Sequence, residues 1–219
     1  LQQTLAEIED NFDKYRLSDA LMAIYKLVWD DFCSWFLEMI KPGYQQPIDR
    51  KTFEKAIEML EANLKLLHPF MPFISEELWH LVRERKDGDD IIIAPWPAIV
   101  PSNAALLTTF PTAAQLVAEV RNFRQSKNVS PKEAVEVRYR TNGDASPINI
   151  FGGIICKLAN VTSLTAVTEK PDGSFPFIVK DIECFIPLPD AVDKGAEKDR
   201  LQKDLEYNKG FLKSVEAKL

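Results

Sequence analysis

The sequence predicts a mainly α-helical fold: a helical bundle over residues 1–110, a small α+β domain over 111–190, and a helix of the coiled-coil type over 191–219. Three observations lead to this prediction. Apolar residues recur every three or four positions through the first third of the chain. The apolar period then falls to two residues over 134–140, and three- and four-residue steps return in the last segment.

The first helix is already under way at the first residue. Leu1, Leu5, Ile8 and Phe12 follow 4-3-4 spacing, which is typical of one buried helix face. We therefore expect that the parent protein continues before this point. Ser18 is the expected N-cap of the next helix, since a serine hydroxyl can accept a hydrogen bond from a free backbone N–H.

The second helix carries apolar residues around much of its circumference and is expected to end at Pro42 and Gly43. Such a helix belongs in the middle of a bundle. Trp29, Trp35 and Phe36 are therefore predicted to lie in the core and not to offer surfaces for stacking. The two apolar stripes are Leu17, Leu21, Ile24, Val28, Phe32, Trp35 and Met39, and Tyr25, Trp29, Phe36 and Ile40.

A proline corner follows in the bundle. Asp49 can cap a helix whose apolar positions run to Leu67, and Pro69 is expected to force His68 out of helical geometry. A third helix is predicted over 72–85. The proline-punctuated residues 91–111 suit an extended segment better than a helix.

The second domain mixes both periods. A helix is predicted over 112–127, a half-buried strand over 134–140, and a helix from Pro147 to about Leu158. Three further strands are expected over 162–168, 175–180 and 182–187, with Pro171-Asp172-Gly173 as a turn.

The last segment has a narrow apolar seam, which needs a partner helix. Self-association of the chain through the seam is one expectation, and folding back onto the small domain is another. The seam consists of Leu201, Leu205, Asn208, Leu212, Val215 and Leu219.

Composition indicates an ordinary folded protein, with 46% hydrophobic and 27% charged residues. No apolar run reaches the ~18 residues of a membrane span, and no secretory signal is recognisable, so we expect a cytoplasmic protein without membrane contact. Cys33, Cys156 and Cys184 are far apart in apolar stretches, which favours buried thiols over disulfides or metal sites.

Charge is uneven along the chain. Residues 1–110 carry 11 Lys and Arg against 18 Asp and Glu, whereas residues 111–140 carry 6 against 3. Arg121 and Arg124 lie about one helical turn apart in the basic stretch, where they could hold phosphates despite the net charge of −6. The alternative is that they pair with Glu119 and other acids on a solvated face.

The sequence shows no arrangement of residues that is typical of a catalytic site. His68 and His80 are the only histidines. Neither has a serine or cysteine nucleophile at a suggestive spacing, and no cluster of His and Cys has metal-ligand spacing. The pairs Asp30-Asp31 and Glu76-Glu77 point about 100° apart on a helix. We therefore expect no catalytic residue, cofactor or metal in this chain, and a role in binding or positioning.

Several strings, in this order, resemble the C-terminal anticodon-binding region of valyl-tRNA synthetases, which are class I enzymes. They cover essentially the whole chain. The strings are Tyr-Arg-Leu-Ser-Asp-Ala at 15–20, Trp-Asp-Asp-Phe-Cys-Ser-Trp-Phe-Leu-Glu-Met-Ile-Lys at 29–41, Leu-His-Pro-Phe-Met-Pro-Phe-Ile-Ser-Glu-Glu-Leu-Trp at 67–79, Trp-Pro at 96–97, Val-Arg-Asn-Phe-Arg at 120–124, Pro-Asp-Ala-Val-Asp at 189–193 and Glu-Lys-Asp-Arg-Leu-Gln-Lys at 197–203. Within the second string, Asp-Phe-Cys-Ser-Trp-Phe-Leu-Glu at 31–38 points to the valine enzymes in particular.

The resemblance implies that residues 1–110 form an anticodon-binding domain and that 191–219 begin a coiled-coil arm. It implies tRNA(Val) as partner and a monomeric parent whose ATP-binding catalytic domain and editing domain lie before Leu1. No catalytic activity is then expected of this chain itself. The expected RNA-binding residues are Arg121, Arg124, Lys127 and Asn122, together with Lys41 and Arg16. The alternative function is a protein-interaction or structural module that uses the 201–219 seam.

Overall fold

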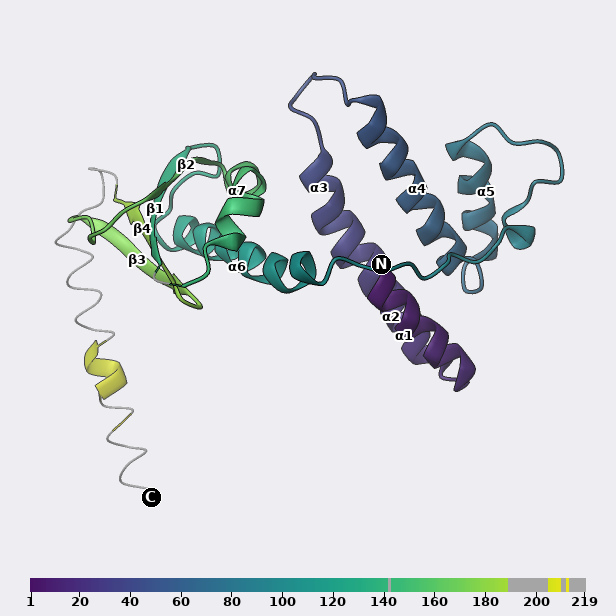
Figure 1. Ribbon diagram of the computed structural model, residues 1–219, viewed down its shortest axis with the longest axis horizontal. Coiled ribbons are helices and arrows are strands. Elements are labelled where there is room, and N and C mark those ends of the chain that lie inside the picture. The colour runs from purple at the N-terminus through teal and green to yellow at the C-terminus, as the bar shows by residue number, and fades with distance from the viewer. Residues whose placement is uncertain (142, 189–204, 210–211, 213–219) are drawn as a thin grey trace. The chain divides into compact units, whose positions relative to one another are not determined.

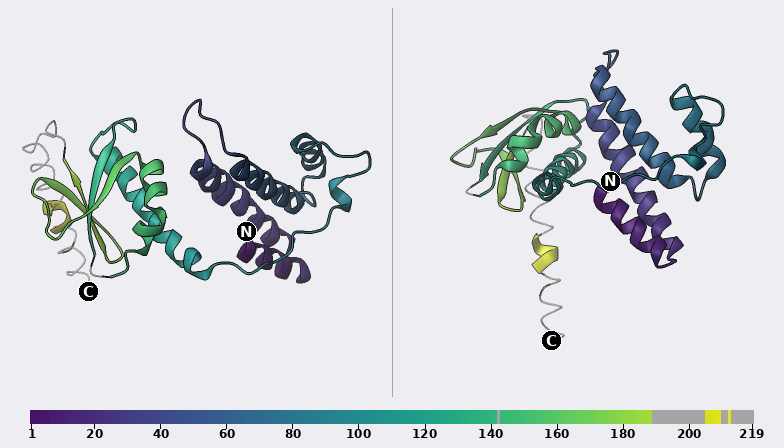
Figure 2. Two further views of the ribbon diagram at one scale, coloured as in Figure 1. Left: turned by 45° about the horizontal axis from the view of Figure 1, so that its top comes forward. Right: turned by 45° about the vertical axis from the view of Figure 1, so that its right-hand side comes forward.

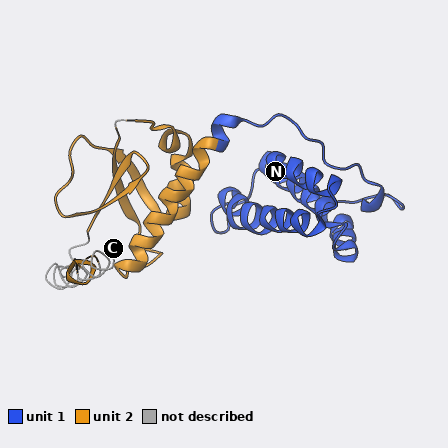
Figure 3. Cartoon of the chain, turned by 90° about the horizontal axis from the view of Figure 1, so that it is seen from below, with its two compact units in different colours: residues 1–107 blue, residues 108–219 orange. Residues whose placement is uncertain are grey.

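The chain forms two compact units, Leu1–Leu107 and Thr108–Leu219 (Figure 3). The computed structural model describes residues 1–141, 143–188, 205–209 and 212. The first unit is helical and the second contains helices and a four-stranded sheet (Figure 1). The predicted mainly helical fold with a small α+β part is therefore confirmed. Most of the expected coiled-coil helix lies outside the described residues.

The helical unit is a series of helices with one short 3-10 turn. Among the described residues, no helix has both the length and the apolar character that crossing a bilayer requires. The elements are α1 (Gln2–Asp13), α2 (Leu17–Lys26), the π-helix η1 (Leu27–Phe36), α3 (Leu37–Ile40), α4 (Arg50–Leu67), α5 (Pro72–Val82) and the 3-10 turn η2 (Ile91–Ile93).

One core of this unit forms where α1 crosses α2 near the end of α4. Leu5 and Ile8 from α1, Ile24 from α2 and Leu66 from α4 are completely buried there. Phe12 stacks on Phe70, with the ring centroids 6.1 Å apart. The 4-3-4 spacing of the first helix therefore marks a buried face, as predicted.

α2, η1 and α3 follow one another without a break, so residues 17–40 form one long helical rod. The prediction that this rod lies in the middle of the bundle is wrong, because part of its second apolar stripe faces solvent. Ser18 is also not the N-cap: the cap position is Arg16 and carries no side-chain hydrogen bond. The stripes were drawn with the 3.6-residue period of an α-helix, whereas η1 is a π-helix with a wider turn. Its side chains therefore do not line up on the predicted faces.

The second core of the unit holds α4, α5 and η2 together. Trp79 packs with Leu64 and Ile91, and its indole Nε1 donates to the Asp89 carbonyl at 3.0 Å. The Arg85 guanidinium lies over the Trp79 ring, 3.4 Å from its centroid. These contacts fix α5 and the segment after it against α4.

The proline corner between α4 and α5 differs in detail from the prediction. Asp49 caps α4 as expected, because its carboxylate accepts from the Thr52 N–H at 2.9 Å. His68 keeps helical angles despite Pro69, with φ −54° and ψ −41°, so that expectation is wrong. Helix α5 starts at Pro72 as predicted but ends at Val82, before Arg85.

The α+β unit contains two longer helices and four strands (Figure 2). The expected extended segment up to residue 111 is wrong at its end, since α6 begins at Ala104 and contains Pro111. The Asn103 side chain accepts from the Leu106 N–H at 3.2 Å, which caps this start. The elements are α6 (Ala104–Ser126), β1 (Val135–Thr141), α7 (Ser146–Ala159), β2 (Val161–Ala166), β3 (Ser174–Val179) and β4 (Ile182–Pro187).

The sheet has the order β2-β1-β4-β3, in which β1 and β2 are parallel and the other pairs antiparallel. Val135 and Val137 of β1 are buried, whereas Glu136 and Arg138 on the opposite face are half-exposed. Helices α6 and α7 lie on the same side of the sheet (Figures 1 and 2). The strand alternation predicted for 134–140 is confirmed, and the unit is two-layered.

Candidate nucleic-acid interface

The predicted RNA-binding residues of the second unit lie in the last turns of α6 and directly after it. Arg121 and Asn122 are exposed, and Lys127 is half-buried. The Lys127 ammonium lies over the Phe175 ring of β3, 5.2 Å from its centroid. Arg121 and Asn122 therefore reach solvent, while Lys127 already takes part in the packing of the helix on the sheet.

Arg124 is an internal residue, only 6% exposed. Its two terminal nitrogens donate to four carbonyls: Ser130 and Glu133 in the loop before β1, and Ala159 and Asn160 at the end of α7, at 2.6–3.1 Å. Burial lowers the pKa of Arg124, and the charge of Glu133 opposes that shift. This guanidinium is used within the fold, so we leave Arg124 out of the proposed RNA contacts.

Arg121 also reaches the carbonyl end of α7, but from the surface. One terminal nitrogen donates to the Leu158 carbonyl at 2.9 Å. The described partner is thus a helix C-terminus, whose partial negative charge favours a cation, and not the expected Glu119. One hydrogen bond leaves the remaining N–H groups of an exposed guanidinium able to face a phosphate.

Two other cations of the basic stretch, both in β1, form ion pairs with glutamates of the sheet. Arg138 forms an ion pair with Glu136 at 3.1 Å, and Arg140 forms one with Glu183 at 2.6 Å. Hydrogen bonding and the charge of Glu136 raise the pKa of Arg138. Arg138 and Arg140 are therefore already paired with carboxylates, and Arg121 is an exposed arginine of this stretch whose described partner is a carbonyl.

The two predicted basic contacts of the helical unit lie on separate helices. Arg16 is exposed directly before α2, and Lys41 is exposed directly after α3. Lys41 forms a surface ion pair with Glu38 at 3.3 Å. Both cations remain accessible, although a surface ion pair of this kind contributes little energy.

An aromatic pair on the long helical rod was missed by the sequence analysis. Trp29 is 60% exposed and Tyr25 is 52% exposed. Their rings stack with centroids 6.3 Å apart and an interplanar angle of 8°. The prediction of a core position for Trp29 is wrong, while Trp35 and Phe36 are half-buried. Both residues lie on one predicted apolar stripe with four-residue spacing, which was the signal for a pair, but that stripe was expected to be buried.

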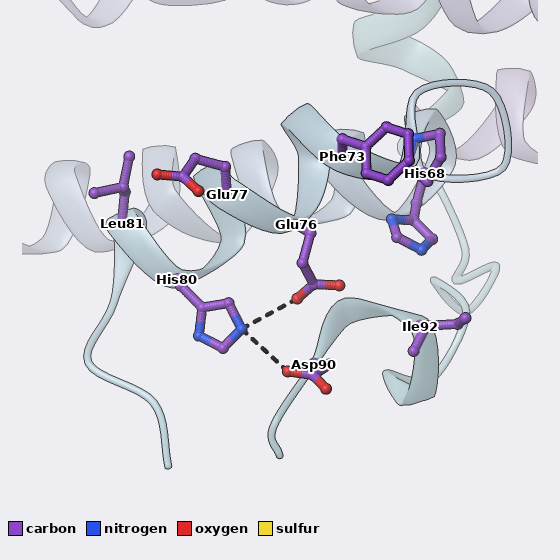
Figure 4. Close-up of a pocket in the computed structure, with 9 residues that line it drawn as sticks. His68, Phe73, Glu76, Glu77, His80, Leu81, Asp90 and Ile92 are labelled. Carbon is purple, nitrogen blue, oxygen red and sulfur yellow. Dashed lines mark hydrogen bonds and ion pairs between the residues drawn. The ribbon is translucent and has the colours of Figure 1, made fainter. Parts of the chain in front are cut away.

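One cluster of possible metal ligands lies among the described residues. His80 and Glu76 of α5 meet Asp90 from the following segment (Figure 4). No site was predicted at His80, because its partners here are carboxylates and not serine, cysteine or histidine. The i, i+4 spacing of Glu76 and His80 was the signal that could have found two of the three groups.

A family model and several curated proteins that resemble this chain all concern tRNA ligases. The family described as "Anticodon-binding domain of tRNA ligase" matches residues 1–139. The chain is 47% identical over 218 residues to a Valine–tRNA ligase of Christiangramia forsetii, covering 100% of this chain and 25% of that protein. It is 44% identical over 219 residues to one of Parabacteroides distasonis, again covering 100% and 25%. A Bacillus cereus Valine–tRNA ligase is 31% identical over 213 residues, 93% of this chain and 24% of that protein. The chain thus spans about a quarter of the length of these relatives.

Proposed function

Because the chain belongs to the family of anticodon-binding domains of tRNA ligases, we propose that it binds the anticodon stem and loop of tRNA(Val). In this proposal it positions the tRNA for aminoacylation with valine, an ATP-dependent reaction carried out by other domains of a cytoplasmic, monomeric ligase. Residues 1–110 supply the anticodon-binding domain and 191–219 the start of an arm. The observation that carries the proposal is the similarity to Valine–tRNA ligases along the entire chain.

The exposed stack of Tyr25 and Trp29 supports a role in reading unpaired bases. Single-stranded RNA is commonly held by stacking its bases on aromatic side chains, at about 1–3 kcal/mol per base. A ring that is 60% exposed and held parallel to its neighbour has a defined face for such a base. We propose Trp29 as that platform in place of the core position predicted for it.

Arg121 is the proposed phosphate contact of the second unit, with Asn122 beside it as a hydrogen-bonding partner. Arg16 and Lys41 have the same proposed role in the helical unit, and Lys127 supports the end of α6. Phosphate contacts position an RNA without reading its sequence. Local cations can do this on a protein of net charge −6, since screening limits the field of distant acids to about 8–10 Å.

The test is binding of a tRNA(Val) transcript to the chain and its variants across a salt series. Trp29→Ala should weaken binding by about 5- to 100-fold, corresponding to one lost stacking contact, and Trp29→Phe should retain most of the affinity. Arg121→Glu should weaken binding and lower the slope of log affinity against log salt by about one. Ile178→Ala and Lys170→Glu are controls, since each changes an exposed side chain of the α+β unit, one apolar and one cationic, that has no proposed RNA contact.

Unchanged affinity in Trp29→Ala would remove the aromatic platform from the proposal. An unchanged salt slope in Arg121→Glu would remove the phosphate contact. If the unmodified chain binds tRNA(Val) no better than a tRNA for another amino acid, the proposed specificity is wrong.

A second candidate function is a protein-interaction module. It is supported by two leucines of the predicted seam in the described part of the tail. Leu205 and Leu212 are both exposed. If the seam pairs two copies, the chain should sediment as a dimer, and Leu205→Asp with Leu212→Asp should make it monomeric. A monomer at all concentrations would reject self-association through this segment.

A further inference from the structure

The strongest unassigned feature is the group of ligand atoms from Glu76, His80 and Asp90. The atoms His80 Nε2, Glu76 Oε1 and Asp90 Oδ1 point toward one another (Figure 4). The distance from His80 Nε2 is 3.1 Å to Glu76 Oε1 and 3.3 Å to Asp90 Oδ1. One ligand atom from each residue lies within 4.8 Å of the others.

These separations suit a small divalent ion. Ligand bonds to Zn²⁺ are about 2.0–2.2 Å long, so two ligands of one tetrahedral or octahedral ion lie about 2.9–3.5 Å apart. Both measured distances to His80 fall in this interval. Two carboxylates with a neutral imidazole carry a charge of −2, which one divalent ion balances.

The backbone around the cluster is held in place before any ion binds. Glu76 and His80 share one face of α5 because they are four residues apart. On either side of Asp90, the Asp89 carbonyl accepts from the Trp79 indole at 3.0 Å, and the Ile91 N–H donates to Glu76 Oε1 at 3.1 Å. Trp79 itself is buried. Second-shell hydrogen bonds of this kind orient ligating carboxylates.

The cluster opens onto a surface pocket of about 790 Å³. Phe73, Leu81 and Ile92 form apolar parts of its wall, and His68 lies at the same pocket. Three protein ligands leave at least one coordination position of the ion for water or another donor from this side.

We propose that Glu76, His80 and Asp90 bind a divalent transition-metal ion of the Zn²⁺ type. An imidazole with two carboxylates is a mixed donor set that favours such an ion over Mg²⁺, which takes oxygen ligands and retains its water. The bound ion joins α5 to the segment before η2, two elements that otherwise meet through Trp79 and Ile91. The site therefore stabilises the packing of α5 against the segment before η2.

Calorimetric titration of the full chain with ZnCl₂ tests this proposal. A Cys33→Ser background removes the exposed thiol as a competing ligand. We expect one ion per chain, a higher melting temperature with Zn²⁺, and little response to MgCl₂ at the same concentration. His80→Ala and Glu76→Gln should each weaken binding by more than the about 10- to 100-fold that loss of an outer-shell partner costs.

His68→Ala is the matched control, because His68 is the other histidine of the same pocket and its Nδ1 lies 2.8 Å from the Ser75 hydroxyl. It should leave the affinity for Zn²⁺ unchanged. Circular dichroism of each variant without metal separates loss of ligands from loss of fold, and Glu76→Gln preserves the shape of the side chain if His80→Ala unfolds. Absent binding, or equal loss in the His68 and His80 variants, would overturn the proposal.

Discussion

The two units bury their apolar side chains in different ways. In the α+β unit, Phe123, Leu116 and Ile155 are among the fully buried side chains, together with Ile182 and Ile186 of β4. The helical unit has two separate small cores, one around Leu5 and Ile24 and one around Trp79. It leaves many large apolar side chains exposed, among them Phe73 at 91% and Trp29 at 60%.

This difference indicates that the α+β unit is closed around its own core, whereas the helical unit offers surfaces for contact. Exposed apolar patches on a folded protein commonly mark interaction sites. On this interpretation, residues of the helical unit should respond to a bound partner, and internal residues of the α+β unit should respond to loss of folding.

The largest contrast is expected between two thiols, one in each unit. Cys33 is exposed on η1, whereas Cys184 of β4 is buried and burial raises its pKa to about 12. Burial therefore disfavours the thiolate of Cys184, which is the reactive form. Labelling of the native chain should modify Cys33 and leave Cys184 unlabelled until denaturant is added, as mass spectrometry of the peptides would report. Labelling of both thiols at similar rates would contradict a closed core.

The next effect concerns two arginines one turn apart on α6. Arg124→Ala removes four hydrogen bonds to buried or half-buried carbonyls, and we expect the free energy of unfolding to fall by about 3 kcal/mol. Arg121→Ala removes one surface hydrogen bond and should cost less than about 0.5 kcal/mol. Denaturant unfolding with hydrogen exchange would assign the loss to the α+β unit. Equal losses in the two variants would show that Arg124 is not the internal link.

The smallest expected effect is at the N-cap of α4. Hydrogen bonds from Thr52 lower the pKa of Asp49 in the folded chain, so the ionised cap stabilises the helix above the unfolded pKa of about 3.9. This contribution is lost as the pH falls through the lower, folded pKa. Asp49→Ala should therefore slightly lower the denaturant midpoint between pH 5 and 7. The difference from the unmodified chain should shrink below pH 4; a constant difference would assign the effect to packing instead.

Helices, strands and a helix cap could be predicted from the sequence more accurately than the burial of their side chains. The periodicities of residues 1–12 and 134–140 led to a helix and a strand that the structure confirms, and Asp49 could be identified as a cap from its position alone. Burial of Trp29 was predicted wrongly, because a stripe of apolar residues does not reveal whether a neighbouring helix covers it. Exposure of Cys33 was missed for the same reason.

Two further predictions failed for physical reasons. The prolines were expected to end helices, and contacts between residues far apart in the sequence could not be predicted. Pro111 lies inside α6 and Pro69 leaves His68 helical, because each proline removes one donor without preventing helical angles around it. Arg124 was taken for a surface cation since the carbonyls that bind it come from residues up to 36 positions away. Asp90 likewise lies ten residues after His80, and the sequence does not show that the segment after α5 folds back to bring the two together.

We propose that tRNA(Val) contacts the exposed aromatic pair of the helical unit, Tyr25 and Trp29, and the Arg121 end of α6. Hydrogen exchange of the chain with and without a tRNA(Val) transcript tests it most directly. We predict added protection around Tyr25 and Trp29 and around Arg121, with the β4 core around Ile186 unchanged. Protection confined to other segments, or the same protection with an unrelated tRNA, would show that these residues are not a specific tRNA(Val) contact.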